Sequence, residues 1–264
     1  MSALADVLAK SRAEDRAALI GYLPVGYPSV GTSIDAMVAM VAAGADVVEV
    51  GVPYSDPVMD GPTIQAAAEQ AVRAGVGMRD VFLATRAVAD AGAAAVVMSY
   101  WNPIEHYGVD RFAADLAAAG GAGAITPDLI PDEAAQWLFA SDRHRLDRVF
   151  LVAPSSTQAR LQSTVAASRG FVYAASTMGV TGTREQVSGT AAALVARVRA
   201  VADLPVCVGL GVSDAAQAAQ VAGFADGVIV GSAFVRRLLD EQGPSGVAAV
   251  GALAGELAAG VRRR

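Results

Sequence analysis

Short runs of apolar and often β-branched residues alternate along this chain with longer segments whose apolar residues recur at helical spacing. The short runs predict buried strands of a parallel sheet, because a strand that is covered on both faces is apolar throughout. We expect eight strands, at Ala18–Leu23, Asp46–Val50, Ala95–Met98, Gly123–Thr126, Arg148–Val152, Phe171–Ala174, Pro205–Gly209 and Gly227–Val230.

The segments between these runs predict helices. Two of them show the spacing clearly, through Ile34, Met37, Val38 and Val41 and through Leu194, Val195, Val198 and Val201. Pro62 is expected to open a helix at its first position. His106, within Asn102–Gly108, is interpreted as a loop residue and not as a catalyst.

Strands that alternate with helices pair in parallel, and eight such units close into a (β/α)8 TIM barrel of roughly 250 residues. The 264 residues fit this size, with an extra N-terminal helix. An open doubly wound sheet is the alternative, which the number of units disfavours. No linker or low-complexity tract divides the chain, so we expect residues 1–264 to form a single catalytic domain.

Composition narrows the chemistry. A net charge of −6 disfavours nucleic acid and acidic membranes as partners, and the apolar stretch Gly246–Val261 is interrupted by Glu256 and is interpreted as a docked terminal helix. One cysteine, Cys207, and the absence of a secretory signal favour the cytoplasm. With Lys10 as the only lysine and two histidines, a buried Schiff-base lysine and a His-rich metal site are both disfavoured, and no metal is expected. Carboxylates remain to carry catalysis.

Glu49 is the first candidate, because it interrupts a run of valines near the carboxyl end of the second strand. TIM-barrel enzymes place their active sites at that end, and burial raises a carboxyl pKa towards neutrality, as a general acid or base requires. The alternative is an outward carboxylate that pairs with an arginine, a role that Asp46 at the start of the strand could also fill.

The loop after this strand, Pro53–Pro62, holds Asp56 and Asp60. Asp60 is either a second catalytic carboxylate opposite Glu49 or part of a turn that caps the following helix. The spacing alone does not decide between these roles.

Glycine-rich segments after the last three strands, at Gly179–Gly182, Gly209–Ser213 and Gly231-Ser232, predict a phosphate site built from backbone N–H groups. Ordinary turn chemistry is the alternative for any one of them. Five residues at strand ends or in the loop after a strand could line a flat apolar pocket for an aromatic substrate: Tyr22, Met98, Tyr100, Tyr173 and Leu210.

The run Gly51–Gln65 closely resembles the signature of tryptophan synthase α subunits. The resemblance continues, in order, through nearly the whole chain, at Tyr22–Pro28, Asn102-Pro103, Pro127–Leu129, Gly179–Gly182, Gly209–Val212 and Gly231-Ser232. Many family members carry arginine where this chain has Thr177, which concerns the latching of a mobile loop and not the reaction.

The resemblance implies cleavage of indole-3-glycerol phosphate to indole and glyceraldehyde 3-phosphate without a cofactor in this chain. It implies Glu49 as the general acid–base, Asp60 at the indole nitrogen, and Tyr22, Met98, Tyr100, Tyr173, Thr181 and Leu210 at the substrate. Gly182, Gly211, Gly231 and Ser232 would hold the phosphate. Loops at Pro53–Asp60 and Thr177–Gly189 would close over the substrate.

The resemblance also implies a β subunit that carries pyridoxal phosphate and receives the indole in an αββα (α2β2) complex, with Asp56 near the contact. Three rivals are another phosphate-binding barrel enzyme, a non-catalytic barrel that activates a partner, and a free-standing lyase that releases indole. An indole-glycerol-phosphate synthase would need a catalytic lysine, and the presence of both Glu49 and Asp60 argues against lost catalysis.

Overall fold

The computed structural model describes residues 3–175 and 184–263, and in 184–188 it describes the backbone only. Within these residues nine parallel strands form one sheet in the order β5-β4-β3-β2-β1-β9-β8-β7-β6. The strands are β1 Ala18–Pro24, β2 Val47–Gly51, β3 Ala94–Met98, β4 Gly123–Ile125, β5 Asp147–Val149, β6 Leu151–Val152, β7 Val172–Ala175, β8 Val206–Gly209 and β9 Gly227–Val230.

The fifth predicted strand is divided at Phe150 into β5 and β6. The first half pairs with β4 and the second with β7, and the Tyr173 N–H donates to the Phe150 carbonyl at 3.1 Å. The sheet therefore closes on itself through this one segment, and the eight-unit TIM barrel expected from the sequence is confirmed.

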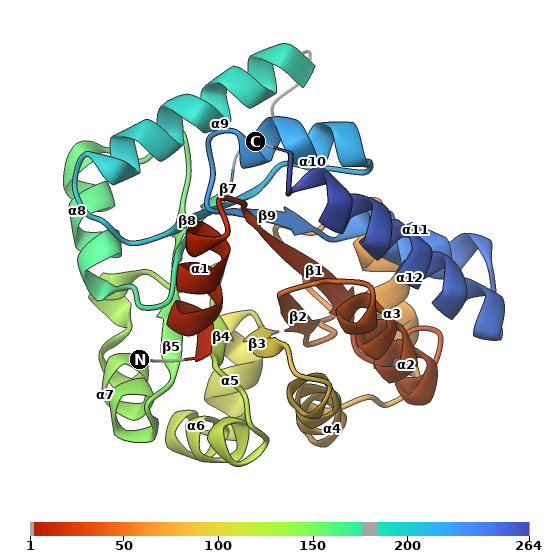
Figure 1. The fold of residues 1–264 in the computed structure, drawn as a ribbon. Helices are drawn as coiled ribbons and strands as arrows, with labels where there is room; N and C mark the ends of the chain where they lie inside the picture. The colour runs from red at the N-terminus through yellow and green to blue at the C-terminus, as the bar shows by residue number, and fades with distance from the viewer. Residues whose placement is uncertain (1–2, 176–183, 264) are drawn as a thin grey trace.

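Helices surround the barrel on the outside, except α1, which lies across one end of it (Figure 1). They are α1 Ala3–Ala13, α2 Val30–Ala42, α3 Pro62–Arg73, α4 Met78–Asp90, α5 Trp101–Tyr107, α6 Val109–Ala118, α7 Ala135–His144, α8 Gln158–Ala167, α9 Arg184–Arg199, α10 Ala215–Ala222, α11 Ser232–Asp240 and α12 Gly243–Gly260, with a 3₁₀ turn at Pro131–Glu133. Pro62 is the first residue of α3, as expected.

Side chains alternate along each strand between two apolar clusters. Val48 and Val50 of β2 point outwards to the helices, whereas Val47 points into the barrel. The apolar C-terminal segment forms α12, which packs on α2, α10 and α11 through residues such as Val250 and Leu253. No helix in the described part of the chain is long and apolar enough to cross a membrane.

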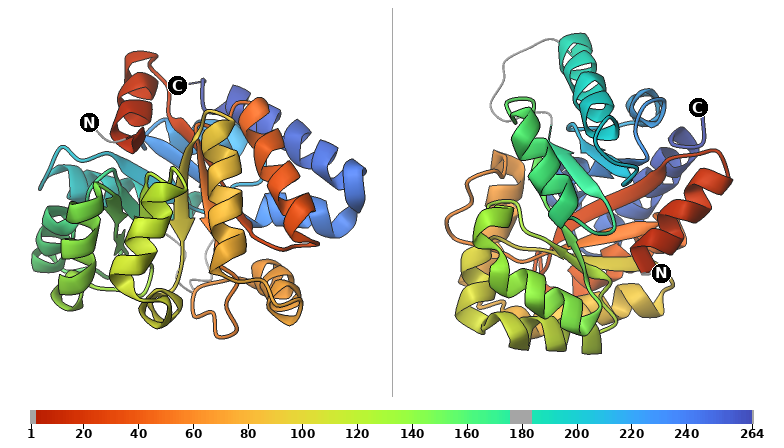
Figure 2. Two further views of the ribbon diagram at one scale, coloured as in Figure 1. Left: turned by 90° about the horizontal axis from the view of Figure 1, so that it is seen from below. Right: turned by 90° about the vertical axis from the view of Figure 1, so that its left-hand side faces the viewer.

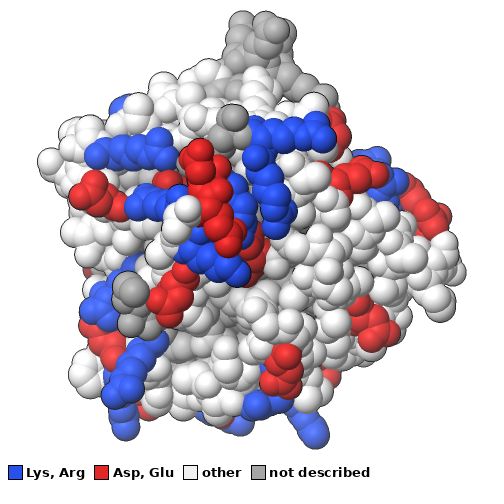
Figure 3. All heavy atoms as spheres, in the orientation of Figure 1, with Lys and Arg blue, Asp and Glu red and all other residues white. Residues whose placement is uncertain are grey.

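The extra N-terminal helix α1 closes one end of the barrel. Leu4 and Leu8 are fully buried against the inward-facing strand residues, and α1 lies at the opposite end of the molecule from the segment after β2 (Figure 2, left). Acidic and basic side chains lie side by side on the face that carries α1 (Figure 3).

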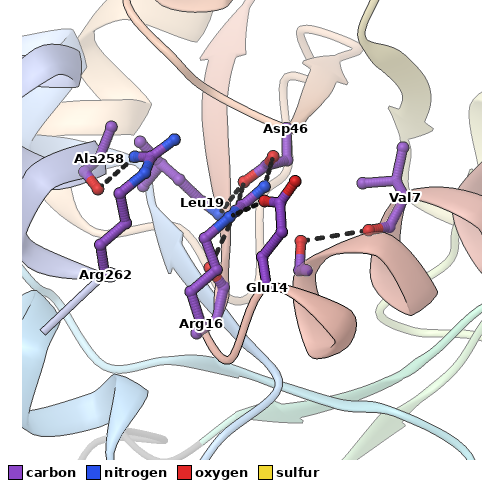
Figure 4. Close-up of polar contacts among 9 residues, drawn as sticks. Val7, Glu14, Arg16, Leu19, Asp46, Ala258 and Arg262 are labelled. Carbon is purple, nitrogen blue, oxygen red and sulfur yellow. Dashed lines mark hydrogen bonds and ion pairs between the residues drawn. The ribbon is translucent and has the colours of Figure 1, made fainter. Parts of the chain in front are cut away.

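Asp46, at the start of β2, belongs to this closed end. Its carboxylate accepts from both terminal nitrogens of Arg16 at 2.7 and 2.8 Å and from the Leu19 N–H at 2.8 Å (Figure 4). The structural ion pair with an arginine, which was the alternative role for Glu49, is therefore made by Asp46. Glu49 lies nearer the opposite end of the barrel.

Candidate active site

A cavity of about 410 Å³ opens at the carboxyl ends of the strands. It brings together nine side chains or glycines that the sequence singled out: Tyr22, Glu49, Asp60, Met98, Tyr173, Leu210, Gly211, Gly231 and Ser232. Its wall also includes Val58, Met59, Ile64, Leu151, Ala175, Gly209 and Ile229. Thr177, Thr181 and Gly182 lie outside the described residues.

Glu49 lies in β2 on the inward side, next to Val47 in the alternation and in register with Tyr22 of β1. The side chain is 1% exposed, and its Oε1 atom has no hydrogen-bond partner within the described residues. Burial without a compensating charge raises the pKa of Glu49 to about 8. The carboxyl group is therefore protonated near neutrality and can donate a proton into the cavity.

Asp60 reaches the cavity from the loop between β2 and α3. Burial raises the pKa of Asp60 to about 6, so this carboxyl group is largely ionised at neutral pH. Gly61 is the N-cap of α3, without a side-chain cap, and the contact of Asp60 to the helix uses its backbone carbonyl, which accepts from the Gln65 amide at 2.7 Å. Because the carboxylate makes no cap to α3, it is available to a ligand.

Two tyrosines flank the carboxyl groups, each against a glycine of the adjacent strand. A Cβ atom on Gly51 would lie 2.7 Å from the Tyr22 hydroxyl, and one on Gly209 would lie 2.4 Å from that of Tyr173. Burial, and then the charges of Glu49 and Asp60, raise the pKa of both tyrosines well above the ordinary range. Both hydroxyls stay neutral, and the glycines leave the room that the rings occupy.

Backbone of β8, β9 and α11 forms the other side of the cavity. Gly231 is the N-cap of α11, Ser232 is its first residue, and Gly211 has a positive φ of 68°. The N-terminus of a helix presents free N–H groups and a partial positive charge. Among the described residues that line the cavity there is no lysine or arginine.

Two candidates lie beside the cavity and not in its wall. Tyr100 is 5% exposed, and its hydroxyl accepts from the Met59 N–H at 2.9 Å. Asp56 is exposed on the loop, where its carboxylate accepts from the Ser55 hydroxyl. The predicted C-terminal boundary of the loop Thr177–Gly189 is wrong, because helix α9 already begins at Arg184.

Some of the lining residues that the sequence analysis missed could have been identified from the alternation of side chains along a strand. Ala175 lies two residues after Tyr173, and Ile229 lies two residues before Gly231, so each faces inwards with its neighbour. Met59 and Val58 follow no such rule, because they belong to an irregular loop. Among the residues that the structure describes, no cluster of His, Cys, Asp and Glu could hold a metal ion.

The model of the tryptophan synthase alpha chain family matches residues 8–262. The chain belongs to the tryptophan synthase alpha chain family. This family cleaves indole-3-glycerol phosphate, a carbon–carbon lyase reaction of tryptophan biosynthesis, and the chain has this activity.

Relatives and solved structures agree with this membership. The chain is 64% identical over 263 residues to the tryptophan synthase alpha chain of Mycolicibacterium paratuberculosis, covering 100% of this chain and 96% of that one. A structure of tryptophan synthase from Mycobacterium tuberculosis matches with a TM-score of 0.93 and 64% identity, covering 99% of this chain and 98% of that chain. The tryptophan synthase alpha chain from Legionella pneumophila matches with a TM-score of 0.89 at 30% identity, covering 99% and 97%.

Proposed function

We propose that Glu49 and Asp60 carry out the cleavage of indole-3-glycerol phosphate to indole and glyceraldehyde 3-phosphate within this cavity. The observation that carries the proposal is the buried Glu49 carboxyl. Its Oε1 has no hydrogen-bond partner among the described residues, and its pKa of about 8 keeps it protonated beside the ionised Asp60. General acid–base catalysis is most effective when the pKa of the group that transfers the proton lies near the working pH, as that of Glu49 does, and an ionised carboxylate such as Asp60 can stabilise positive charge on the substrate.

The reaction begins with proton transfer from Glu49 to the indole carbon that bears the glycerol chain. The ring becomes cationic, and the Asp60 carboxylate stabilises the charge at the ring N–H. Glu49, now a carboxylate, removes the proton of the hydroxyl on the adjacent chain carbon. The electrons of that O–H bond form the aldehyde, and those of the broken carbon–carbon bond restore the indole. Glu49 ends in the protonation state in which it began.

The indole ring and the phosphate group of the substrate are proposed to bind in different parts of the cavity. Tyr22, Met98, Tyr173 and Leu210 line the part that takes the flat ring, and Thr181 is expected to join them. The phosphate would lie at the start of α11, on the N–H groups of Gly231 and Ser232 and near Gly211, with Gly182 expected to complete the site. Because the described lining holds no cation, backbone dipoles would supply this binding.

The single-domain organisation and the partner are also part of the proposal. We infer that residues 1–264 act as one catalytic domain in the cytoplasm, without a cofactor of their own. Lys10, the only lysine, is exposed in α1 at the closed end of the barrel, so pyridoxal phosphate would belong to a β subunit. An αββα complex would place the Pro53–Asp60 loop, with Asp56, towards this β subunit.

The test is turnover of the purified chain with indole-3-glycerol phosphate, measured as the release of indole and of glyceraldehyde 3-phosphate. Both products are expected in equal amounts, and Glu49→Gln should lower the rate by roughly 10²–10⁴-fold while the protein stays folded. Near-normal turnover by folded Glu49→Gln protein would contradict the assignment. Turnover measured with and without a β subunit distinguishes the proposed complex from a free-standing lyase.

A further inference from the structure

Tyr100 lies between β3 and α5, and its side chain reaches the loop that carries Asp60. The Tyr100 hydroxyl accepts the N–H of Met59, the residue immediately before Asp60, at 2.9 Å. The ring is 5% exposed and does not line the cavity, although Met59 and Asp60 do. The position of Tyr100 thus differs from the direct substrate contact that the sequence suggested.

More than one backbone group acts on this hydroxyl. Burial raises the pKa of Tyr100, and the charge of Asp60 raises it further, whereas the N–H groups of Met59, Val58 and Asp60 lower it. The geometric hydrogen bond is the one from Met59, and the hydroxyl that accepts it is a neutral phenol at physiological pH. This hydrogen bond restrains the backbone at Met59, one residue before Asp60.

The support behind Tyr100 is well anchored. The Tyr54 ring packs on it with centroids 5.3 Å apart, and the Asn102 amide donates to the Tyr54 hydroxyl at 3.1 Å. The Trp101 N–H donates to the Asp128 carboxylate at 2.9 Å, which fixes the start of α5 to the loop after β4. In contrast, the Val58 side chain is 83% exposed, so it adds little packing to the loop.

We propose that Tyr100 is a positioning residue for Asp60: by accepting the Met59 N–H, its hydroxyl fixes the backbone that presents the Asp60 carboxylate to the cavity. Tyr100 contacts the loop and not the indole ring. The inference rests on the proposed function, in which Asp60 stabilises the charge that develops on the ring. A carboxylate that stabilises a transition state must be held close to its final geometry, since small displacements lower the rate strongly.

The first test is Tyr100→Phe, which removes the hydroxyl and keeps the ring. We expect the Met59 amide of the full chain to exchange its hydrogen about tenfold faster, because a typical hydrogen bond contributes about that factor. Turnover of indole-3-glycerol phosphate should fall mainly through kcat, about tenfold. Tyr27→Phe is the matched control, because Tyr27 is similarly buried, at 7% exposure, and lies away from the cavity.

The second test separates positioning from direct binding. The rate loss caused by Tyr100→Phe should largely disappear when it is introduced into Asp60→Asn protein, since its effect passes through the Asp60 carboxylate. Unchanged exchange at Met59, or the same rate loss in both backgrounds, would overturn the inference and leave the proposed function standing. If Asp60→Asn itself turned over at the normal rate, the role of Asp60 in the proposed function would fail instead.

Discussion

Replacing Glu49 by glutamine should stabilise the fold at neutral pH while it removes catalysis. Burial raises the pKa of Glu49 from its ordinary value of 4.5 to about 8, so the folded protein keeps a proton that the unfolded chain releases. The contribution of this proton to the free energy of unfolding is present in full below pH 4.5 and is lost as the pH rises from 4.5 through 8. Glutamine has a similar shape and no charge to bury at any pH.

The magnitude follows from the difference between the two pKa values. Each pH unit between them lowers the free energy of unfolding of the wild type by about 1.4 kcal/mol. The loss is about 3 kcal/mol between pH 4.5 and pH 7, and about 5 kcal/mol once the pH exceeds 8. The glutamine amide must also find hydrogen-bond partners, and this contribution does not vary with pH. The slope against pH is therefore the diagnostic quantity.

The assay is urea unfolding, followed by circular dichroism, of wild type and Glu49→Gln at several pH values from about 5 to 8. The variant should gain about 3–4 kcal/mol relative to wild type across this range. Glu105→Gln makes the same chemical change at an exposed position of α5 and should show almost no gain. A difference between Glu49→Gln and wild type that stays constant with pH would show that burial does not keep Glu49 protonated.

Four further changes test other parts of the site. Asp60→Asn should lower turnover by roughly 10²-fold or more without loss of stability, because the carboxylate is proposed to stabilise developing charge and caps no helix. Lost stability with activity retained per folded molecule would favour the helix-entry role. Gly211→Leu should weaken binding of glycerol phosphate at least about tenfold more than binding of indole, as titration calorimetry can measure, and equal losses would mean that the phosphate site lies elsewhere. Gly51→Ala should cost about 1–3 kcal/mol in urea unfolding, and Tyr22→Leu in the same chain should recover much of it, whereas additive losses would refute their contact. A β subunit should accelerate indole release about tenfold, and Asp56→Ala should reduce this acceleration more than it reduces the rate of the isolated chain; equal reductions would place Asp56 away from the partner.

The barrel could be predicted from the sequence because its signals are local. Valine runs and apolar periodicity place strands and helices without knowledge of their neighbours, as in the predicted and observed strand Gly227–Val230. The division of one strand at Phe150 could not be predicted in this way. It arises because the two halves pair with different strands, which is a property of the closed sheet.

Helix α5 was wrongly expected to be a loop. Its start lacks a local side-chain cap, and the Trp101 N–H is satisfied by Asp128, 27 residues further along the chain. The same limit applies to Tyr100, which the sequence placed in the pocket and the structure places against Met59. Contacts that join distant loops leave no periodic trace in the sequence, whereas Glu49 was identifiable because a charged residue within a valine strand is unusual.

The contact between Tyr22 and two glycines has a consequence for how this pocket can change. The Tyr22 side chain lies between the two glycines. A Cβ atom on Gly231 would lie 3.2 Å from the Tyr22 ring, and a Cβ atom on Gly51 would lie 2.7 Å from it. The Tyr22 ring therefore shares its space with β2 and with the residue that follows β9, and a carbon atom added at Gly51 or Gly231 requires the ring to shift or to become smaller. A single larger side chain at position 51 or 231 is expected to destabilise the protein, whereas the same change combined with a smaller side chain at position 22 is expected to be tolerated. A search for variants that accept a larger indole should accordingly vary positions 22, 51 and 231 together, because a library that changes one position at a time would discard the productive combinations.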